Sequence, residues 1–157
     1  SPEDKANTDL PLLSPQLWAI FKDKRYEYII DIGGDPEGAK VLGRFHLNFS
    51  MCDYDMWMIV NANMPETQTA GEVIDLIKMI ESASRLKVTG IINNTHLMSE
   101  TCPEDIIKGD KLCSEVKEIT GIPVVYTSVG INTEGIPADS IEGEIFPLKT
   151  FLSPDWR

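Results

Sequence analysis

Residues 26–34 read YEYIIDIGG, an apolar run that ends in Asp31 and Ile32 and is closed by a pair of glycines. Three later runs follow the same plan: MWMIV at 56–60, LKVTGII at 86–92 and IPVVY at 122–126, each followed by small or polar residues. Nearly continuous apolar runs are typical of strands that are buried on both faces. The pattern therefore predicts four strands, the first of them over Tyr26–Ile32.

Helical patterns lie between these runs. The predicted helices are a short one from Ser14, residues 37–45, residues 69–84 and residues 101–120. Thr69 with Glu72, and Thr101 with Glu104, fit the capping box that begins a helix, and Gly121 is a natural helix stop. Strands that alternate with helices predict an α/β fold with three layers, in which a mainly parallel sheet is flanked by helices.

The chain divides into three parts. Residues 1–13 are polar and are expected to form a lead-in, and residues 14–129 hold the α/β pattern. Residues 130–157 contain three prolines together with large apolar side chains. Because those side chains need cover, we expect an extended C-terminal tail packed on the domain rather than a free one.

The amino-acid composition excludes several classes of function. The 157 residues include 25 acidic and 14 basic side chains, so the net charge is −11. Neutralising phosphates needs a basic surface, so nucleic acid is an improbable partner. No apolar run reaches the about 18–20 residues that span a membrane. The three cysteines are odd in number and lack metal-like spacing, which indicates free thiols and a reducing cytoplasm. No stretch at the start resembles a signal peptide, so we expect a cytoplasmic protein.

Small and polar residues follow each predicted strand, where a parallel sheet binds its ligands. The candidate site residues are Asp31, Gly33, Gly34, Asp35, Asn61, Asn93, Asn94, Thr127 and Ser128. The amides of Asn93 and Asn94 could offer a donor and an acceptor to a purine edge. They could equally cap a turn or a helix, and both interpretations stay open.

Asp31 is the sharpest candidate. An apolar strand ending in Asp-x-Gly-Gly has the layout of the second motif of nucleotide hydrolases, in which the carboxylate holds Mg²⁺ through water and a glycine N–H meets the terminal phosphate. Glycine suits that place because a side chain would block the approach of the phosphate. Alternatively, Asp31 caps a turn and Gly33-Gly34 reverse the chain. Residues 33–41 are not themselves a P-loop, because the lysine comes one residue late and no hydroxyl follows it.

Residues 28–45 (YIIDIGGDPEGAKVLGRF) resemble the Asp-x-Gly-Gly-Asp segment of MinD/ParA/CobQ-like P-loop nucleotide hydrolases. The resemblance continues in residues 60–67, 87–97 and 121–129, in the family's order, and is nearest to its cobyrinic acid synthase-like, ATP-binding branch. It implies that Asp31 is the Mg²⁺-linked acid and catalytic residue, that Gly33 and Gly34 approach the γ-phosphate, and that Asp35 lies in the switch segment. It also implies that Asn93 or Asn94 contacts the base, with Asn61, Thr127 and Ser128 bordering the pocket.

The family's P-loop strand, its lysine and the following helix have no counterpart here. In the family that strand lies between the strands that end in Asp31 and Asn61, so the resemblance implies an incomplete or split sheet. We therefore expect the C-terminal portion of an ATPase that needs Mg²⁺ and ATP (or GTP) when complete. Alone, the chain should bind triphosphate weakly and be inactive. The open strand edge should pair with the missing P-loop segment or with a second copy in a homodimer.

Two alternatives remain at this point. The chain could be a natural degenerate α/β interaction domain without nucleotide hydrolysis. It could also be a flavodoxin-like module that holds a flavin phosphate at the polar strand ends. A flavodoxin-like module should have a hydroxyl-rich phosphate loop after the first strand, and the sequence has no such loop there.

Overall fold

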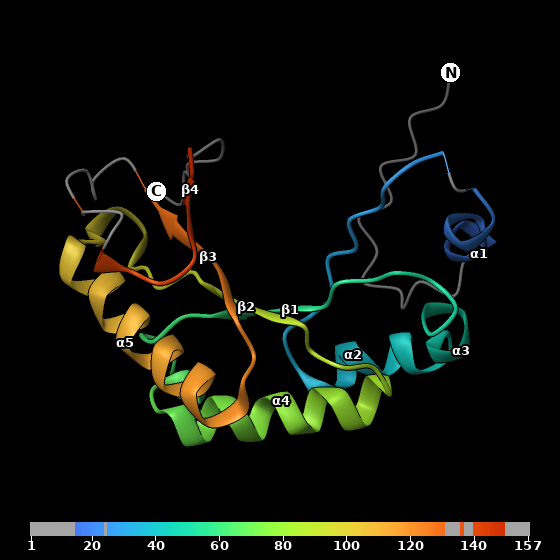
Figure 1. Ribbon diagram of the computed structural model, residues 1–157, viewed down its shortest axis with the longest axis horizontal. Helices are drawn as coiled ribbons and strands as arrows, with labels where there is room; N and C mark the ends of the chain where they lie inside the picture. The colour runs from blue at the N-terminus through green and yellow to red at the C-terminus, as the bar shows by residue number, and fades with distance from the viewer. Residues whose placement is uncertain (1–14, 24, 131–135, 137–139, 150–157) are drawn as a thin grey trace, which may run out of the picture.

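The computed structural model describes residues 15–23, 25–130, 136 and 140–149 (Figure 1). The predicted lead-in, residues 1–13, and much of the predicted tail lie outside the described residues. The elements are α1 (Pro15–Lys22), α2 (Pro36–Gly43), α3 (His46–Phe49), β1 (Trp57–Val60), η1 (Pro65–Thr67), α4 (Ala70–Ser84), β2 (Gly90–Asn93), η2 (Met98–Glu100), α5 (Pro103–Thr120), β3 (Val124–Val129) and β4 (Glu144–Pro147).

The four strands form one sheet in the order β1-β2-β3-β4, and every neighbouring pair is parallel. Parallel strands need crossover connections, which α4 supplies between β1 and β2 and α5 supplies between β2 and β3. The predicted α/β class with a parallel sheet is therefore confirmed. Val60 lies opposite Asn93, and Asn93 lies opposite Thr127, so the carboxyl ends of the first three strands meet at one edge.

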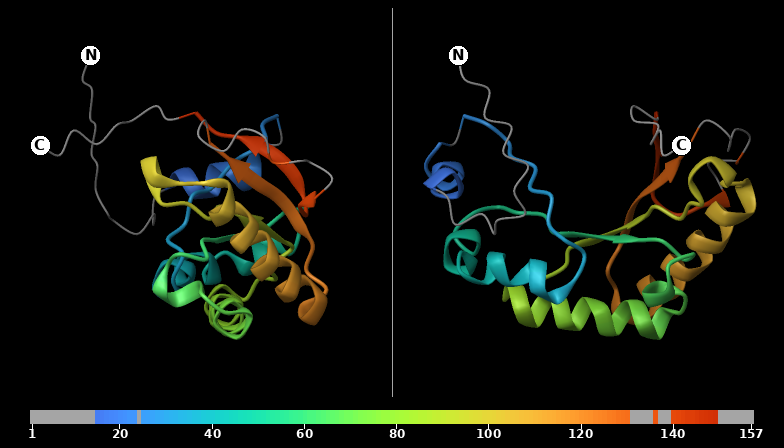
Figure 2. Two further views of the ribbon diagram at one scale, coloured as in Figure 1. Left: turned by 90° about the vertical axis from the view of Figure 1, so that its left-hand side faces the viewer. Right: turned by 180° about the vertical axis from the view of Figure 1, so that it is seen from behind.

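The helices α4 and α5 cover the same face of the sheet, because both crossovers run in the same direction along it (Figures 1 and 2). The core on this side of the sheet is apolar. It consists of Ala39, Met58, Val60, Ala62, Ala70, Val73, Ile77, Ile80, Val88, Ile91, Leu112, Cys113, Val116 and Val124. On the other face Trp57, Ile59 and Phe146 are about half exposed. The described residues therefore make two layers, and the prediction of a third layer is wrong for this part of the chain.

The predicted first strand does not form. Residues 27–33 carry no strand, Tyr28 is partly exposed and the side chain of Ile29 is fully exposed. A strand requires a partner for its backbone N–H and C=O groups, and no described strand offers one to this segment. The sheet ends instead at β1. The prediction of a buried strand over Tyr26–Ile32 is therefore wrong for this chain as it stands.

Helix starts follow the predicted chemistry in one of two cases. At α4 the Thr69 hydroxyl accepts from the Glu72 N–H at 3.3 Å, and the Glu72 carboxylate accepts from the Thr69 N–H at 2.9 Å, which confirms the capping box. At α5 the box is displaced by one residue. The Cys102 N–H donates to the Asp105 carboxylate at 3.0 Å, so the box predicted one residue earlier is wrong.

The last strand is held by a small polar cluster at its entry. The Thr127 hydroxyl donates to the Glu142 carbonyl at 2.8 Å, and the Glu142 N–H donates to the Asp110 carboxylate at 2.7 Å. An ion pair of 2.8 Å joins Lys117 to the Glu142 carboxylate. These bonds attach the chain to α5 and β3 just before it enters β4.

Candidate functional site

The carboxyl ends of β1, β2 and β3 and the loops that follow them, which we call the polar edge, are joined by a network of hydrogen bonds. Asn93, the last residue of β2, is fully buried. Its amide donates to the Ile106 carbonyl at 3.1 Å and accepts from the Thr95 N–H at 3.2 Å. The Thr95 hydroxyl in turn accepts from the Ala62 N–H at 3.0 Å. Both ends of the Asn93 amide are therefore engaged in joining β2 to α5 and to the next loop.

Asn61 joins the loops that follow β1 and β2. Its amide nitrogen donates to the His96 carbonyl at 3.3 Å, and its amide oxygen accepts from the N–H groups of Asn63 (3.0 Å) and His96 (3.3 Å). The Thr67 hydroxyl donates to the Asn61 carbonyl at 2.7 Å. The structure thus gives Asn61 a positioning role, since it sets the path of two loops at this edge.

A second cluster at the edge escaped the sequence analysis. The Asn63 amide donates to the Asp105 carboxylate at 2.9 Å, and Lys108 donates to the Asn63 amide oxygen at 2.8 Å. The bond from the Cys102 N–H, and then the bond from Asn63, lower the pKa of Asp105 below its usual range. The spacing of Asp105 and Lys108 by three residues on one helix was a readable signal, but their shared partner lies more than 40 residues earlier.

Of the predicted site residues at the polar edge, two keep a side chain without a hydrogen bond to the described residues. The amide of Asn94 is half-buried, and only its backbone N–H bonds, to the Val60 carbonyl at 2.8 Å. Ser128 is buried at the end of β3, one residue beyond Thr127. The hydroxyl of Thr127 is engaged with Glu142. At this edge Asn94 and Ser128 are therefore the better placed of the predicted residues to meet a ligand.

The Asp31 segment lies outside the sheet and leads into α2. Asp31 is exposed, and no described hydrogen bond joins residues 31–35 to the polar edge. The Asp35 carboxylate accepts from the Gly38 N–H at 2.8 Å and caps α2. Gly38 is needed for close packing, because a Cβ there would lie 2.8 Å from the Gly33 carbonyl oxygen.

The pair Gly33-Gly34 is not explained by packing. Neither residue has a positive φ. A Cβ at Gly34 would meet nothing within 4 Å, and a Cβ at Gly33 would make only ordinary contacts, the nearest at 3.6 Å. The fold would accept alanine at both positions. Glycine at these two positions would allow a ligand to approach the backbone closely.

The described residues contain no group of three or more His, Cys, Asp or Glu side chains that could hold a metal. Asp31 offers one carboxylate. That fits Mg²⁺, which takes most of its ligands from water and substrate phosphates. Burial raises the pKa of the Cys113 thiol to about 12, while Cys52 is exposed and Cys102 is partly buried. The core position predicted for Cys113 is confirmed.

No helix in the described part of the chain is both long enough and apolar enough to cross a membrane. No protein-family model matches the chain, and no curated protein or solved structure matches it either. A functional assignment therefore rests on the residues and their geometry.

Proposed function

We propose that this chain is the C-terminal portion of a MinD/ParA/CobQ-like ATP-binding protein and carries two parts of its nucleotide switch. One part is the segment Asp31–Asp35, which would face Mg²⁺ and the γ-phosphate. The other is the polar edge after β1, β2 and β3, which would face the base. In this proposal the chain is inactive until a strand and a P-loop complete the sheet, and the complete protein hydrolyses ATP.

The observation that carries the proposal is the open edge of the sheet at β1, together with the unpaired segment 27–33. Residues 27–33 are apolar enough for a strand, yet they pair with no described strand and most of them are exposed. The strand β1 ends the sheet, with Trp57 and Ile59 about half exposed. A parallel strand inserted between them would pair with the backbone N–H and C=O groups of both segments. The missing P-loop segment is the proposed occupant, and a second copy of the chain is the other partner that could pair there.

The glycine pair gives the second support. Because the fold does not require glycine at Gly33 or Gly34, the selection of glycine is explained if a phosphate approaches their N–H groups. Asp31 would hold Mg²⁺ through water, and the metal would neutralise charge on the phosphates. Asp35, as the N-cap of α2, would link the phosphate segment to the start of that helix.

On the base side the proposal assigns different tasks to the two neighbouring asparagines. Asn93 holds the edge together through Ile106 and Thr95. Asn94, whose amide has no described partner, would contact the base. Ser128 would border the pocket from β3. Asn61 would position the loops rather than touch the ligand, because its amide is engaged with His96 and Asn63.

Hydrogen exchange at Tyr28–Ile32 tests the proposed pairing. In the isolated chain these amides should exchange almost as fast as unprotected ones, since no strand pairs with them. In the protein in which a strand and a P-loop precede this chain (the P-loop-bearing protein), sheet pairing should slow them about 100-fold or more. Ile91, whose N–H donates to the Pro123 carbonyl at 2.9 Å, is the internal control and should be protected in both.

Two results would count against the proposal. One is equal exchange at Tyr28–Ile32 in the two proteins. The other is a coding sequence that has no P-loop motif ahead of Ser1.

A degenerate interaction domain without hydrolysis is the second candidate. It is favoured by the uncovered face of the sheet, which carries a row of aromatic side chains from β1, β3 and β4. The Tyr126 ring makes edge contacts with Trp57 and with Phe146, each with ring centroids 5.6 Å apart. Such a row of aromatic side chains is typical of interaction surfaces. ATP hydrolysis by the P-loop-bearing protein separates the two candidates.

A further inference from the structure

A hollow of about 390 Å³ lies where the C-terminal ends of α2 and α4 meet. We call it the basic hollow, because it is lined by Lys40, Gly43, Arg44, His46, Ala83 and Arg85. Four of these six residues are basic or histidine, and none is acidic, although the chain as a whole carries a net charge of −11. Its charge is therefore opposite to that of the rest of the molecule.

Two of the cations have no acidic partner among the described residues. Lys40 forms an ion pair with Glu37, and the His46 ring nitrogen Nδ1 lies 2.9 Å from the Gly43 carbonyl. The guanidinium groups of Arg44 and Arg85 make no ion pair or hydrogen bond with the described residues. A guanidinium presents a planar fork of N–H donors that matches a carboxylate. The guanidinium groups of Arg44 and Arg85 are therefore the groups in the hollow that can bind a carboxylate.

Arg85 occupies a backbone position that favours glycine. It ends α4 in the left-handed conformation, with φ 59° and ψ 23°. A side chain costs about 1 kcal/mol or more in that conformation, and glycine is the usual residue at such helix ends. Strain of this kind persists where the surrounding structure imposes it, and it is common at binding sites.

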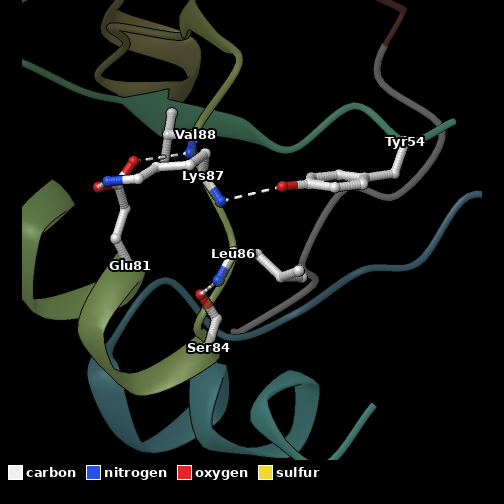
Figure 3. Close-up of polar contacts among 6 residues, drawn as sticks. All are labelled: Tyr54, Glu81, Ser84, Leu86, Lys87 and Val88. Atoms are coloured by element: carbon white, nitrogen blue, oxygen red, sulfur yellow. Dashed lines mark hydrogen bonds and ion pairs between the residues drawn. The ribbon is translucent and has the colours of Figure 1, made fainter. Parts of the chain in front are cut away.

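Figure 3 shows the polar contacts of the residues that precede and follow Arg85 in the sequence. Before it, the Ser84 hydroxyl accepts from the Leu86 N–H at 3.2 Å. After it, the Tyr54 hydroxyl accepts from the Lys87 N–H at 3.0 Å. The Glu81 carboxylate accepts from the Val88 N–H at 2.9 Å and pairs with Lys87 at 2.6 Å. Glu81, one turn before Arg85, is therefore engaged elsewhere and does not neutralise it.

Helix dipoles alone do not explain the hollow. Cations near the C-termini of α2 and α4 stabilise the helices, and this accounts for some positive charge at the site. The effect requires a cation near the last turn, and Lys40 already supplies one to α2. It does not account for arginine where glycine would be more stable, nor for two guanidinium groups in one hollow that lack a partner in the part of the chain that the structure describes.

We propose that the basic hollow docks an acidic, leucine-containing segment of a partner protein. The two arginines would each take a carboxylate. Leu47 of α3 is exposed and directly follows His46 of the hollow, so we expect a leucine of the segment to pack against it, a contact that a free inorganic anion cannot make. The proposal goes beyond the proposed nucleotide switch and does not depend on it, because it uses neither Asp31–Asp35 nor the polar edge and needs no nucleotide.

The test is fluorescence anisotropy of the 157-residue chain with a labelled peptide of sequence LEELEEL. The matched peptide LQQLQQL, which has no side-chain charge, is the control. We expect the acidic peptide to bind and the neutral one to bind about tenfold or more weakly, because charge-assisted bonds to the arginines are lost. Equal binding of the two peptides, or no binding of the acidic one, would overturn the proposal.

Variants separate docking from helix capping. Arg85→Gly and Arg44→Gln should each weaken peptide binding about tenfold. Arg85→Gly should at the same time melt at an equal or higher temperature, since glycine relieves the left-handed strain. Lys78→Gln, which removes an exposed cation of α4 outside the hollow, should leave binding unchanged. Unchanged affinity in Arg85→Gly would overturn the proposal, as would displacement of the peptide by an equal concentration of inorganic phosphate.

Discussion

The variant Gly109→Ala is expected to be strongly destabilised. A Cβ at Gly109 would lie 2.1 Å from the Thr95 hydroxyl oxygen and 2.2 Å from the Asn93 amide oxygen. Both side chains are almost completely buried and hydrogen-bonded, so neither can turn away without leaving a polar group unsatisfied. Either α5 moves away from β2 or the network at the polar edge breaks. We expect a loss of about 3 kcal/mol in the free energy of unfolding.

Denaturation by urea, followed by circular dichroism, measures this loss. Gly71→Ala in α4 is the matched control, because a Cβ there meets nothing within 4 Å. Alanine favours a helix by about 1 kcal/mol over glycine, so Gly71→Ala should be neutral or stabilising. If Gly109→Ala unfolds at the same urea concentration as the wild type, the close contact between α5 and the polar edge is incorrect.

Gly34→Ala is expected to abolish ATP hydrolysis by the P-loop-bearing protein while leaving its fold intact. A methyl group at this position meets no atom of the described chain, so stability should be unchanged. If the γ-phosphate approaches the backbone here, the same methyl group displaces it from its N–H donors. Loss of such a bond lowers the turnover rate about 100-fold or more.

Gly71→Ala serves again as the control, since it adds the same methyl group in open space on another element and should retain full hydrolysis. Steady-state phosphate release and a melting curve should be measured on each variant. Normal turnover by Gly34→Ala would show that glycine at this position is not needed for phosphate. The glycine pair would then support only a turn.

Local patterns predicted local structure well. The apolar runs at 56–60 and 122–126 became β1 and β3, and the spacing of Thr69 and Glu72 placed the start of α4 correctly. These features depend on near neighbours in the sequence. The strand over Tyr26–Ile32 failed because a strand depends on a partner that its own sequence does not specify.

The polar edge shows the same distinction within the candidate site. The sequence placed Asn61, Asn93 and Thr127 at one edge, which the parallel register confirms. It could not reveal that the Asn93 amide is engaged with Ile106, because that bond depends on how closely α5 packs at Gly109. The tight packing at this glycine, rather than any motif, determines which asparagine stays available.

The role of Asp31 is tested most directly by measuring the Mg²⁺ dependence of ATP hydrolysis in the P-loop-bearing protein and in its Asp31→Asn variant. Asp53→Asn, another exposed aspartate outside the proposed site, is the control. We predict that Asp31→Asn lowers turnover about 100-fold and requires more Mg²⁺, because the carboxylate that holds the hydrated metal is lost, while Asp53→Asn behaves as the wild type. Wild-type turnover and Mg²⁺ dependence in Asp31→Asn would contradict the proposed nucleotide switch.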